Sequence, residues 1–203
     1  MINKLRIVTI LVLCALFGTI WTPAYAGTEK QANIERIFGQ DRFKTMYEIA
    51  LKYNPGMTKN VVLASGNNFP DALAGVPLAK QLDAPILLVD STVESSSDAF
   101  SYLKNHTDKK GNVYILGGNG VIADNFVTAL VNLGYSSVNI HRLAGNDRYE
   151  TAVKIAQELK NDGTEFYVVS GDNFPDALSA SVLAALTGPY DILIVYKQIS
   201  ITW

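Results

Sequence analysis

Short, nearly continuous apolar runs recur along the chain and are separated by stretches with a helical period. The runs cover residues 60–65, 84–90, 112–118 and 136–141, and they are rich in valine, isoleucine and leucine. Strands that are buried on both faces of a parallel sheet have this composition. We therefore predict parallel strands at these four places.

Apolar residues spaced three and four positions apart predict amphipathic helices between the strands. Such stripes are Phe43-Met46-Tyr47-Ala50, Phe126-Ala129-Leu130-Leu133 and Tyr149-Ala152-Val153-Ala156. Gly134 follows the second stripe in the position that a left-handed C-terminal cap prefers. Strands that alternate with helices at short spacing indicate βαβ units with right-handed crossovers, so we expect an α/β fold.

The chain repeats itself. The segment RIFGQDRFKT at 36–45 returns as RLAGNDRYET at 142–151, and SGNNFPDAL at 65–73 returns as SGDNFPDAL at 170–178. Self-similarity of this kind indicates a duplicated structural unit. We expect a first repeat over residues 36–141 and a second over 142–203. The second lacks a counterpart of the later strands and is incomplete.

The repeated nine-residue stretch follows a predicted strand and opens a helix. Glycine permits a tight bend, asparagine can cap free amides, proline suits a first helical turn, and aspartate suits the positive end of the helix dipole. We expect the phenylalanines to plug the sheet. These fold-motif residues are Gly66, Asn68, Phe69, Pro70 and Asp71, and then Gly171, Asn173, Phe174, Pro175 and Asp176.

A ligand site at the same turns is the functional alternative, because strand ends in α/β sheets often bind ligands. The glycine patterns of nucleotide-binding loops are absent, and LGGNG at 116–120 is only a weak candidate for an anion nest. No nucleophile motif is present, and His106 and His141 have no metal-ligand spacing. We expect no catalysis, no metal and no cofactor.

Four arginines are duplicated: Arg36 with Arg142, and Arg42 with Arg148. Guanidinium groups suit the recognition of carboxylates or phosphates, so these residues are candidate ligand-binding residues. The structural alternative is that they tie the helix start to the Asp71 or Asp176 turn. Asp41 and Asp147 precede Arg42 and Arg148, and we expect buried salt bridges there.

The first 26 residues have the order of a secretory signal peptide. Lys4 and Arg6 precede an apolar run from Ile7 to Ile20, and Ala24-Tyr25-Ala26 supplies small residues for cleavage before Gly27. The run is shorter than the roughly 20 residues that span a bilayer, although a retained anchor is the alternative. Residues 27–35 form a short linker. We expect a secreted protein with no membrane contact after cleavage.

Charge limits the partners of the secreted chain. Loss of Lys4 and Arg6 leaves 15 basic against 19 acidic residues, a net charge of −4, and no cysteine remains. This charge excludes bulk electrostatic binding of nucleic acid or of an anionic membrane. An anionic partner would have to be held by a local cluster of arginines and backbone amides.

The duplicated motifs resemble a known family. RLAGNDRYETAVKIA with VVSGDNFPDALSA, and RIFGQDRFKTMYEIA with VLASGNNFPDALAG, APILLVD and VYILGGNGVIADNF, are similar to the clostridial-type cell wall binding repeat 2. The resemblance implies Rossmann-like or toprim-like α/β units that pack in threefold sets, and non-covalent anchoring to an anionic polymer of the Gram-positive wall. It also links the segment Pro85, Ile86, Leu87 and Leu88 with polymer binding.

The second repeat departs from this pattern, because Tyr190-Asp191 separates Pro189 from Ile192 and no second VYILGG follows. Either several chains associate to complete the repeat set, or the gene is truncated or frameshifted. Our first hypothesis is a secreted, non-catalytic wall-binding module at the cell surface. The alternatives are the anchoring part of a peptidoglycan hydrolase (amidase or protease) that lacks its catalytic domain, and a small-ligand or nucleotide-binding α/β protein.

Overall fold

The computed structural model describes residues 34–159, 166–187 and 192–196. The chain divides into residues 1–36 and residues 37–203, and the helices and strands described below all belong to the second part. The expected signal peptide, most of the linker and the tail after Tyr196 lie outside the described residues.

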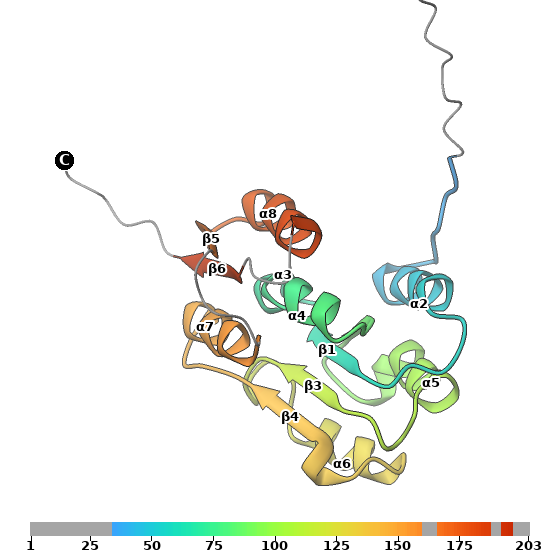
Figure 1. Cartoon of the computed structure of the whole chain (residues 1–203). Helices are drawn as coiled ribbons and strands as arrows, with labels where there is room; N and C mark the ends of the chain where they lie inside the picture. Colours follow the sequence, from blue (N-terminus) through green and yellow to red (C-terminus); the bar gives the residue numbers. More distant parts are fainter. Residues whose placement is uncertain (1–33, 160–165, 188–191, 197–203) are drawn as a thin grey trace, which may run out of the picture. The chain divides into compact units, whose positions relative to one another are not determined.

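A four-stranded parallel sheet in the order β2-β1-β3-β4 forms the centre of the first repeat (Figure 1). Its strands are β1 (Val61–Ser65), β2 (Ile86–Val89), β3 (Val113–Leu116) and β4 (Ile140–Leu143). The first three lie within the predicted apolar runs. The fourth begins four residues after the predicted start, because the 3₁₀ turn η2 (Ser137–Asn139) occupies the intervening residues. The predicted α/β fold with a parallel sheet is confirmed.

Helices cover both faces of this sheet. One apolar cluster joins it to α2 (Arg42–Tyr53), α5 (Ser97–His106), which follows the 3₁₀ turn η1 (Glu94–Ser96), and α6 (Asn125–Asn132). The other cluster joins it to α3 (Pro70–Ala74), α4 (Val76–Gln81) and α7 (Arg148–Glu158). Alternate residues of β1 enter the two clusters, as the two-residue period of a strand requires. After α6, Gly134 adopts a φ of 102°, so the predicted left-handed cap is confirmed.

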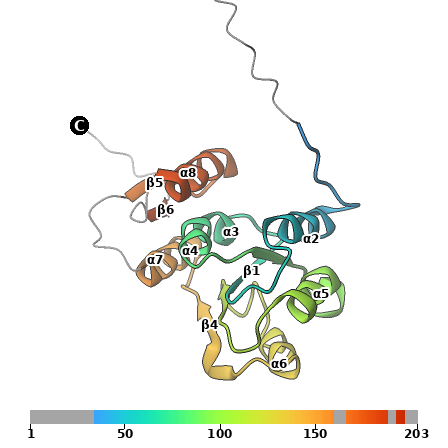
Figure 2. The same ribbon diagram turned by 45° about the vertical axis from the view of Figure 1, so that its right-hand side comes forward.

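The second repeat continues from α7 with β5 (Phe166–Ser170), α8 (Phe174–Thr187) and β6 (Ile192–Tyr196). β5 and β6 pair in parallel as a separate two-stranded sheet. Figures 1 and 2 show α8 beside α3 and α4, and these helices contact one another. The side of α8 with small residues is buried, namely Ala177, Ser181 and Ala184. Small side chains allow two helices to approach closely, so the repeats are packed against each other rather than merely linked.

The two repeats also share a strand. Arg142, where the second copy of the sequence motif begins, lies on β4, and β4 pairs with β3 of the first sheet. Next along the chain, α7 contributes Ala152 and Ile155 to the cluster on one face of that sheet. The start of the second sequence repeat is therefore part of the first folded unit.

The strand order creates one switch point in the first sheet. From β1 the chain moves to β2 on one side and then returns to β3 on the other side. In open α/β sheets, ligands bind in the crevice beyond the carboxyl ends of the strands at such a point. A ligand site in this sheet is therefore expected at the loops after β1 and β3.

Candidate functional site

The two copies of the SG-x-NFPDAL turn meet in space. The rings of Phe69 and Phe174 form an edge-to-face pair with centroids 6.0 Å apart. The side chains do not plug the sheet as predicted, because Phe69 is half-buried and Phe174 is exposed. The two rings instead form one of the contacts between the repeats, so the duplicated turns help to join the two units.

An arginine from the preceding helix holds each turn in place. Arg42 donates from Nη1 to the carbonyl oxygen of Gly66 at 2.7 Å, and Arg148 donates to that of Gly171 at 2.7 Å. The glycine is required at position 66 by close packing, since a Cβ there would lie 2.3 Å from the ring of Phe43. These two arginines therefore tie the start of the helix to the turn in both repeats, as the structural alternative predicted.

Asp71 is the buried acid of this region. It lies in the first turn of α3, is only 7% exposed, and interacts electrostatically with Arg148 of the second repeat. Burial raises the pKa of Asp71, and the charge of Arg148 opposes that shift. Gly117 gives the carboxylate its space, because a Cβ at Gly117 would lie 2.6 Å from Asp71 Oδ2. The equivalent Asp176 also lies in a first helical turn but is exposed.

The predicted buried salt bridges of Asp41 and Asp147 are wrong. Both residues are exposed N-caps: Asp41 accepts from Lys44 N, and Asp147 accepts from Tyr149 N and Glu150 N. Among the described residues neither pairs with the arginine that follows it. A carboxylate at an N-cap satisfies helix amides that would otherwise lack partners, so these side chains stabilise helix starts.

Asn68 of the first turn does not act as predicted either. The N-cap of α3 is Phe69, without a side-chain hydrogen bond, so Asn68 caps no amide. Pro70 occupies the first turn of α3, and Pro175 the first turn of α8, as predicted. The exposed Asn68 side chain is thus not used by the fold at this turn.

Arg142 has a different environment from the helix arginines. From β4 it donates to the carbonyl oxygens of Gly117 and Ile122, both at 2.9 Å, and it pairs with Asp124 at 3.1 Å. These bonds hold the loop after β3 against the sheet. Its repeat equivalent, Arg36, is exposed in a segment without helix or strand.

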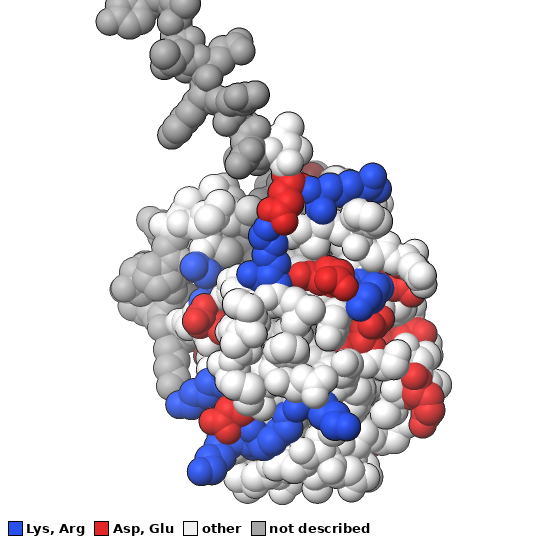
Figure 3. All heavy atoms as spheres, turned by 90° about the vertical axis from the view of Figure 1, so that its right-hand side faces the viewer, with Lys and Arg blue, Asp and Glu red and all other residues white. Residues whose placement is uncertain are grey.

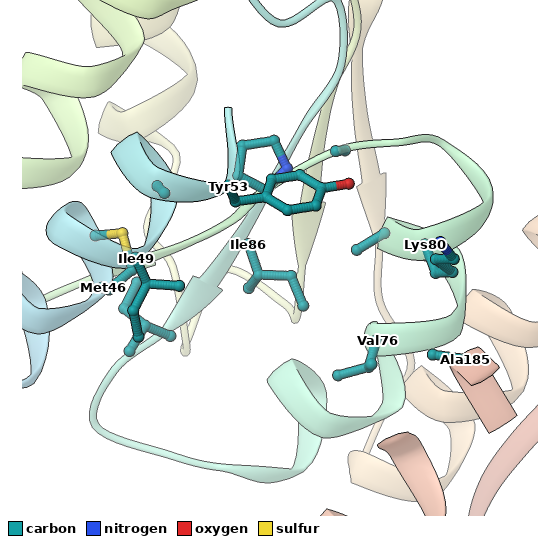
Figure 4. A pocket seen from close by; sticks show the side chains of 12 residues that line it. Met46, Ile49, Tyr53, Val76, Lys80, Ile86 and Ala185 are labelled. Carbon is teal, nitrogen blue, oxygen red and sulfur yellow. The ribbon is translucent and has the colours of Figure 1, made fainter. Parts of the chain in front are cut away.

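The segment linked with polymer binding lies at the β2 edge of the first sheet. Leu87 points into the core and is fully buried. Pro85, Ile86 and Leu88 line an apolar pocket of about 510 Å³ between α2, α4 and β2, with Ala185 of α8 at its rim. Figure 4 shows Ile49 and Tyr53 of α2 on one side of this space and Val76 and Lys80 of α4 on another.

Tyr53, at the end of α2, is fixed beside this pocket. Its hydroxyl donates to Asp83 Oδ1 at 2.6 Å, and this hydrogen bond is the main cause that raises the pKa of Tyr53 to about 12. Asp83 itself has a φ of 50°, a left-handed conformation that aspartate tolerates better than most residues. The bond connects α2 to the turn between α4 and β2 and so sets the width of the pocket.

A second, polar pocket lies at the switch point, between the first repeated turn and the LGGNG loop, which the sequence offered separately as an alternative ligand site and a weak anion nest but did not bring together. Its volume is about 290 Å³, and it is lined by the end of β1 and by the loops after β1, β2 and β3: Ser65, Asn67, Asn68, Ser91, Asn119, Gly120, Val121 and Ala123. The signal available in the sequence was two asparagine-containing loops, SGNN and GGNG, each directly after a buried strand.

Charges of both signs are mixed on the surface. Figure 3 shows basic and acidic side chains interspersed on one face among larger uncharged areas. In the described part of the chain, no group of three or more His, Cys, Asp and Glu residues is placed to hold a metal ion. Within the same residues, no helix combines the length and apolar character needed to cross a membrane.

Two solved structures of proteins from Clostridium difficile share the fold. Cwp8 superposes with a TM-score of 0.74 at 26% sequence identity, over 97% of this chain and 31% of that one. Cwp6 gives a TM-score of 0.67, also at 26% identity, over 87% of this chain and 28% of that one. Both matches extend over the two repeats described above.

Two proteins of Bacillus subtilis (strain 168) are similar in sequence. The N-acetylmuramoyl-L-alanine amidase LytC is 28% identical over 190 residues, which cover 94% of this chain and 36% of the amidase. The amidase enhancer is 32% identical over 163 residues, which cover 78% of this chain and 22% of that protein. The chain therefore spans about a third or less of the length of these relatives.

A family model matches both repeats and confirms the resemblance seen in their motifs. Residues 36–127 and 142–202 match the model described as Cell wall binding domain 2 (CWB2). The matched segments contain both copies of the turn and all four duplicated arginines. The chain belongs to the cell wall binding domain 2 family.

Proposed function

We propose that the chain is a secreted, non-catalytic module that holds a protein on the Gram-positive wall by non-covalent binding to an anionic secondary polymer. The observation that carries the proposal is the family match over both repeats. Secretion is supported by the signal-peptide pattern of residues 1–26. The polymer is the ligand that the resemblance implies.

Arg42 is the arginine best placed to contact an anion. It is exposed, and apart from the bond to Gly66 and its position over the ring of Phe43 its guanidinium has no further partner among the described residues. Arg142 uses its N–H groups on two carbonyl oxygens and Asp124. We therefore propose Arg42 as the main polymer contact, with Arg36, Arg148 and the Pro85–Leu88 edge as further contacts.

Retention on purified cell walls tests the proposal. Purified protein is incubated with walls before and after chemical removal of the anionic polymer, and the bound fraction is measured. We expect retention on intact walls and loss of most of it after extraction. Equal retention on both preparations, or none on either, contradicts the proposal.

Arg42→Gln tests the proposed contact. The change removes one charge and keeps a polar, uncharged side chain, so we expect weaker retention and a smaller dependence on salt concentration. Lys154→Gln, an exposed residue of α7, is the matched control because it removes the same charge elsewhere. Circular dichroism of both variants establishes that they are folded. If the two variants are retained alike, Arg42 is not the contact.

The second candidate function is the anchoring part of a wall hydrolase. The similarity to an amidase and an amidase enhancer, each covered only in part, favours this class of context. In that case the chain itself cleaves no peptidoglycan, and a reading frame for a catalytic domain lies next to it. Release of soluble amino sugars or peptides from walls by the purified chain would contradict both candidates.

We propose in addition that copies of the chain associate head to tail through the surfaces that join the two repeats within one chain. Ile155 of α7 and Leu159, which follows α7 as its C-cap, are 1% and 7% exposed, and they pack in one cluster with Leu78 of α4. Their equivalents on α2, Ile49 and Tyr53, are 48% and 51% exposed on the wall of the apolar pocket.

The other end of the molecule offers the complementary surface. Leu183 of α8 is the repeat equivalent of Leu78, yet it is 44% exposed where Leu78 is fully buried. A second copy can therefore place its α2 on α8 of the first, as α7 is placed on α4. Such a contact uses different surfaces on the two partners, so it generates rings or filaments rather than a twofold dimer.

A further inference from the structure

The polar pocket at the switch point lies where strand order reverses in the first sheet. Ser65 ends β1, and Asn67 and Asn68 follow it in the loop that leads to α3. Asn119 comes from the loop after β3, the neighbouring strand. Three elements of one repeat thus converge on a single hollow beyond the carboxyl ends of the strands, which is the usual ligand position in this class of sheet.

The polar lining of this pocket is neutral. It consists of side-chain amides from three asparagines and hydroxyls from Ser65 and Ser91, and no lysine, arginine, histidine, aspartate or glutamate lines it. A phosphate or carboxylate is normally bound by cations, because charge-assisted bonds are the strong ones. An amide offers both a donor and an acceptor, so it suits a ligand whose hydroxyls also do both.

Two of the amides are held in place by their neighbours. Asn67 donates from Nδ2 to Asp90 Oδ1 at 2.7 Å and to Ser91 Oγ at 3.3 Å, which leaves its carbonyl oxygen for a ligand. Asn119 accepts from Asp124 N at 2.9 Å, which leaves its NH₂ group. Asn68 makes no hydrogen bond to the described residues. Because the first two are already oriented, binding would require little reordering.

The size and the remaining walls fit a single small ring. A volume of about 290 Å³ is at the lower end of small-molecule pockets, too small for a chain of several rings. Val121 and Ala123 add an apolar wall beside the amides. A sugar ring presents hydroxyls at its edge and C–H groups on its face, so it can contact both kinds of wall.

We infer that this pocket binds one neutral sugar residue. The inference rests on the proposed function for the source of the sugar, a glycan of the wall, but the pocket chemistry stands independently of it. Arg42 holds the carbonyl of Gly66, the residue before Asn67, and so lies at the same end of the sheet. A polymer could therefore place a neutral residue in the pocket and an anionic group near Arg42.

The second repeat does not form the same pocket within the described residues. Asp172 replaces Asn67 in the second repeat. The backbone turn is the same in both copies, because the backbone N–H of Asp172 donates to Ser170 Oγ at 3.2 Å and the backbone N–H of Asn67 donates to Ser65 Oγ at 3.2 Å. The described part of the second repeat contains no counterpart of the loop after β3. We therefore expect one sugar site for each chain.

The test is a titration of the ¹⁵N-labelled protein with neutral monosaccharides, namely glucose, mannose and N-acetylglucosamine, and separately with inorganic phosphate. We expect at least one sugar to give saturable shifts of the side-chain amide signals of Asn67, Asn68 and Asn119. The binding should be weak, with a dissociation constant of about 1 mM or higher. Phosphate should neither produce these shifts nor displace the sugar.

Asn68→Ala and Asn119→Ala should each weaken sugar binding about tenfold or more, the loss expected for one or two hydrogen bonds in a pre-formed site. Asn132→Ala, an exposed asparagine of α6, is the matched control and should change nothing. Saturable binding that both pocket variants retain, saturation by phosphate, or no saturation by any of the sugars would overturn the inference. Wall retention of the wild-type protein, measured in parallel, decides the proposed function separately.

Discussion

Asp71 shows how much a single side chain contributes to the junction between the repeats. Its carboxylate is withdrawn from water in the first turn of α3, and only Arg148 of the second repeat opposes the effect of burial on its pKa. A carboxyl whose folded-state pKa is raised stabilises the protein below the unfolded pKa, and this contribution is lost as the pH rises through the folded value.

The first prediction concerns Asp71→Asn. Since the amide cannot ionise, we expect the variant to be more stable than wild type at neutral pH, with a difference that disappears as the pH falls below the ordinary value of 3.8. Thermal unfolding at a series of pH values measures this. Asp176→Asn, at the exposed equivalent position, should show no comparable pH dependence of the difference. A variant less stable than wild type at neutral pH would show that the attraction of Arg148 outweighs burial.

The sequence predicted residue types at the turns better than their roles. Glycine, proline and aspartate are where local backbone rules place them, so Pro70 and Gly134 were predictable. Phe69 was expected in the sheet but contacts Phe174, because the partner is supplied by the other repeat and no local rule describes that contact. Asp41 was expected in an ion pair but caps a helix, a choice that depends on where α2 begins.

At the scale of the elements, α2 and α7 are the same helix in two environments. Both begin at an aspartate N-cap and carry a similar apolar stripe. Both helices pack on the first sheet, and α7 also contacts β6 of the second repeat, whereas Ile49 and Tyr53 of α2 line the open apolar pocket. The difference between them is therefore a measure of what the contact between repeats contributes to stability.

The second prediction compares Ile155→Ala with Ile49→Ala. Replacing the buried Ile155 should lower the free energy of unfolding of the protein by about 2–5 kcal/mol, because the change removes apolar contacts and leaves a cavity. Replacing the exposed Ile49 should lower the free energy of unfolding by about 0.5 kcal/mol or less. Denaturant unfolding gives both values, measured at a protein concentration too low for the chains to associate. Similar losses at the two positions would mean that α2 is already covered in solution.

The sequence alone does not predict that the loops of the polar pocket meet in one place. Each of its loops has the sequence of an ordinary turn after a strand, and the residues around each loop do not predict that Asn67 and Asn119 line the same pocket. That fact follows from the β2-β1-β3 order, which places the two loops on neighbouring strands. The strands and the α/β class were predictable from periodicity, but the strand order and its consequences were not.

For the whole molecule, the prediction is association with a defined polarity. We expect the wild-type protein to show a concentration-dependent mass in light scattering. Ile49→Asp and Leu183→Asp should each abolish it, since either change puts a charge into one of the two apolar surfaces. Val131→Asp, on α6 and 44% exposed, is the matched control.

Mixing the two variants distinguishes a head-to-tail contact from a twofold one. Each variant keeps one intact surface, so an equimolar mixture should form dimers that cannot grow further. Association through a twofold interface would leave the mixture monomeric. A wild-type protein that remains monomeric at high concentration would remove the basis for the proposal.

The strand β4 has a consequence for how such proteins gain and lose copies of the repeat. Because the opening residues of one copy complete the sheet of the copy before it, a duplication with its breakpoint near Arg142 inserts a new unit between partners that already fit. The contacts on both sides of the insertion are copies of existing ones, so no new interface has to evolve. The number of copies can thus change by unequal recombination of the gene, while the geometry of every internal junction stays the same.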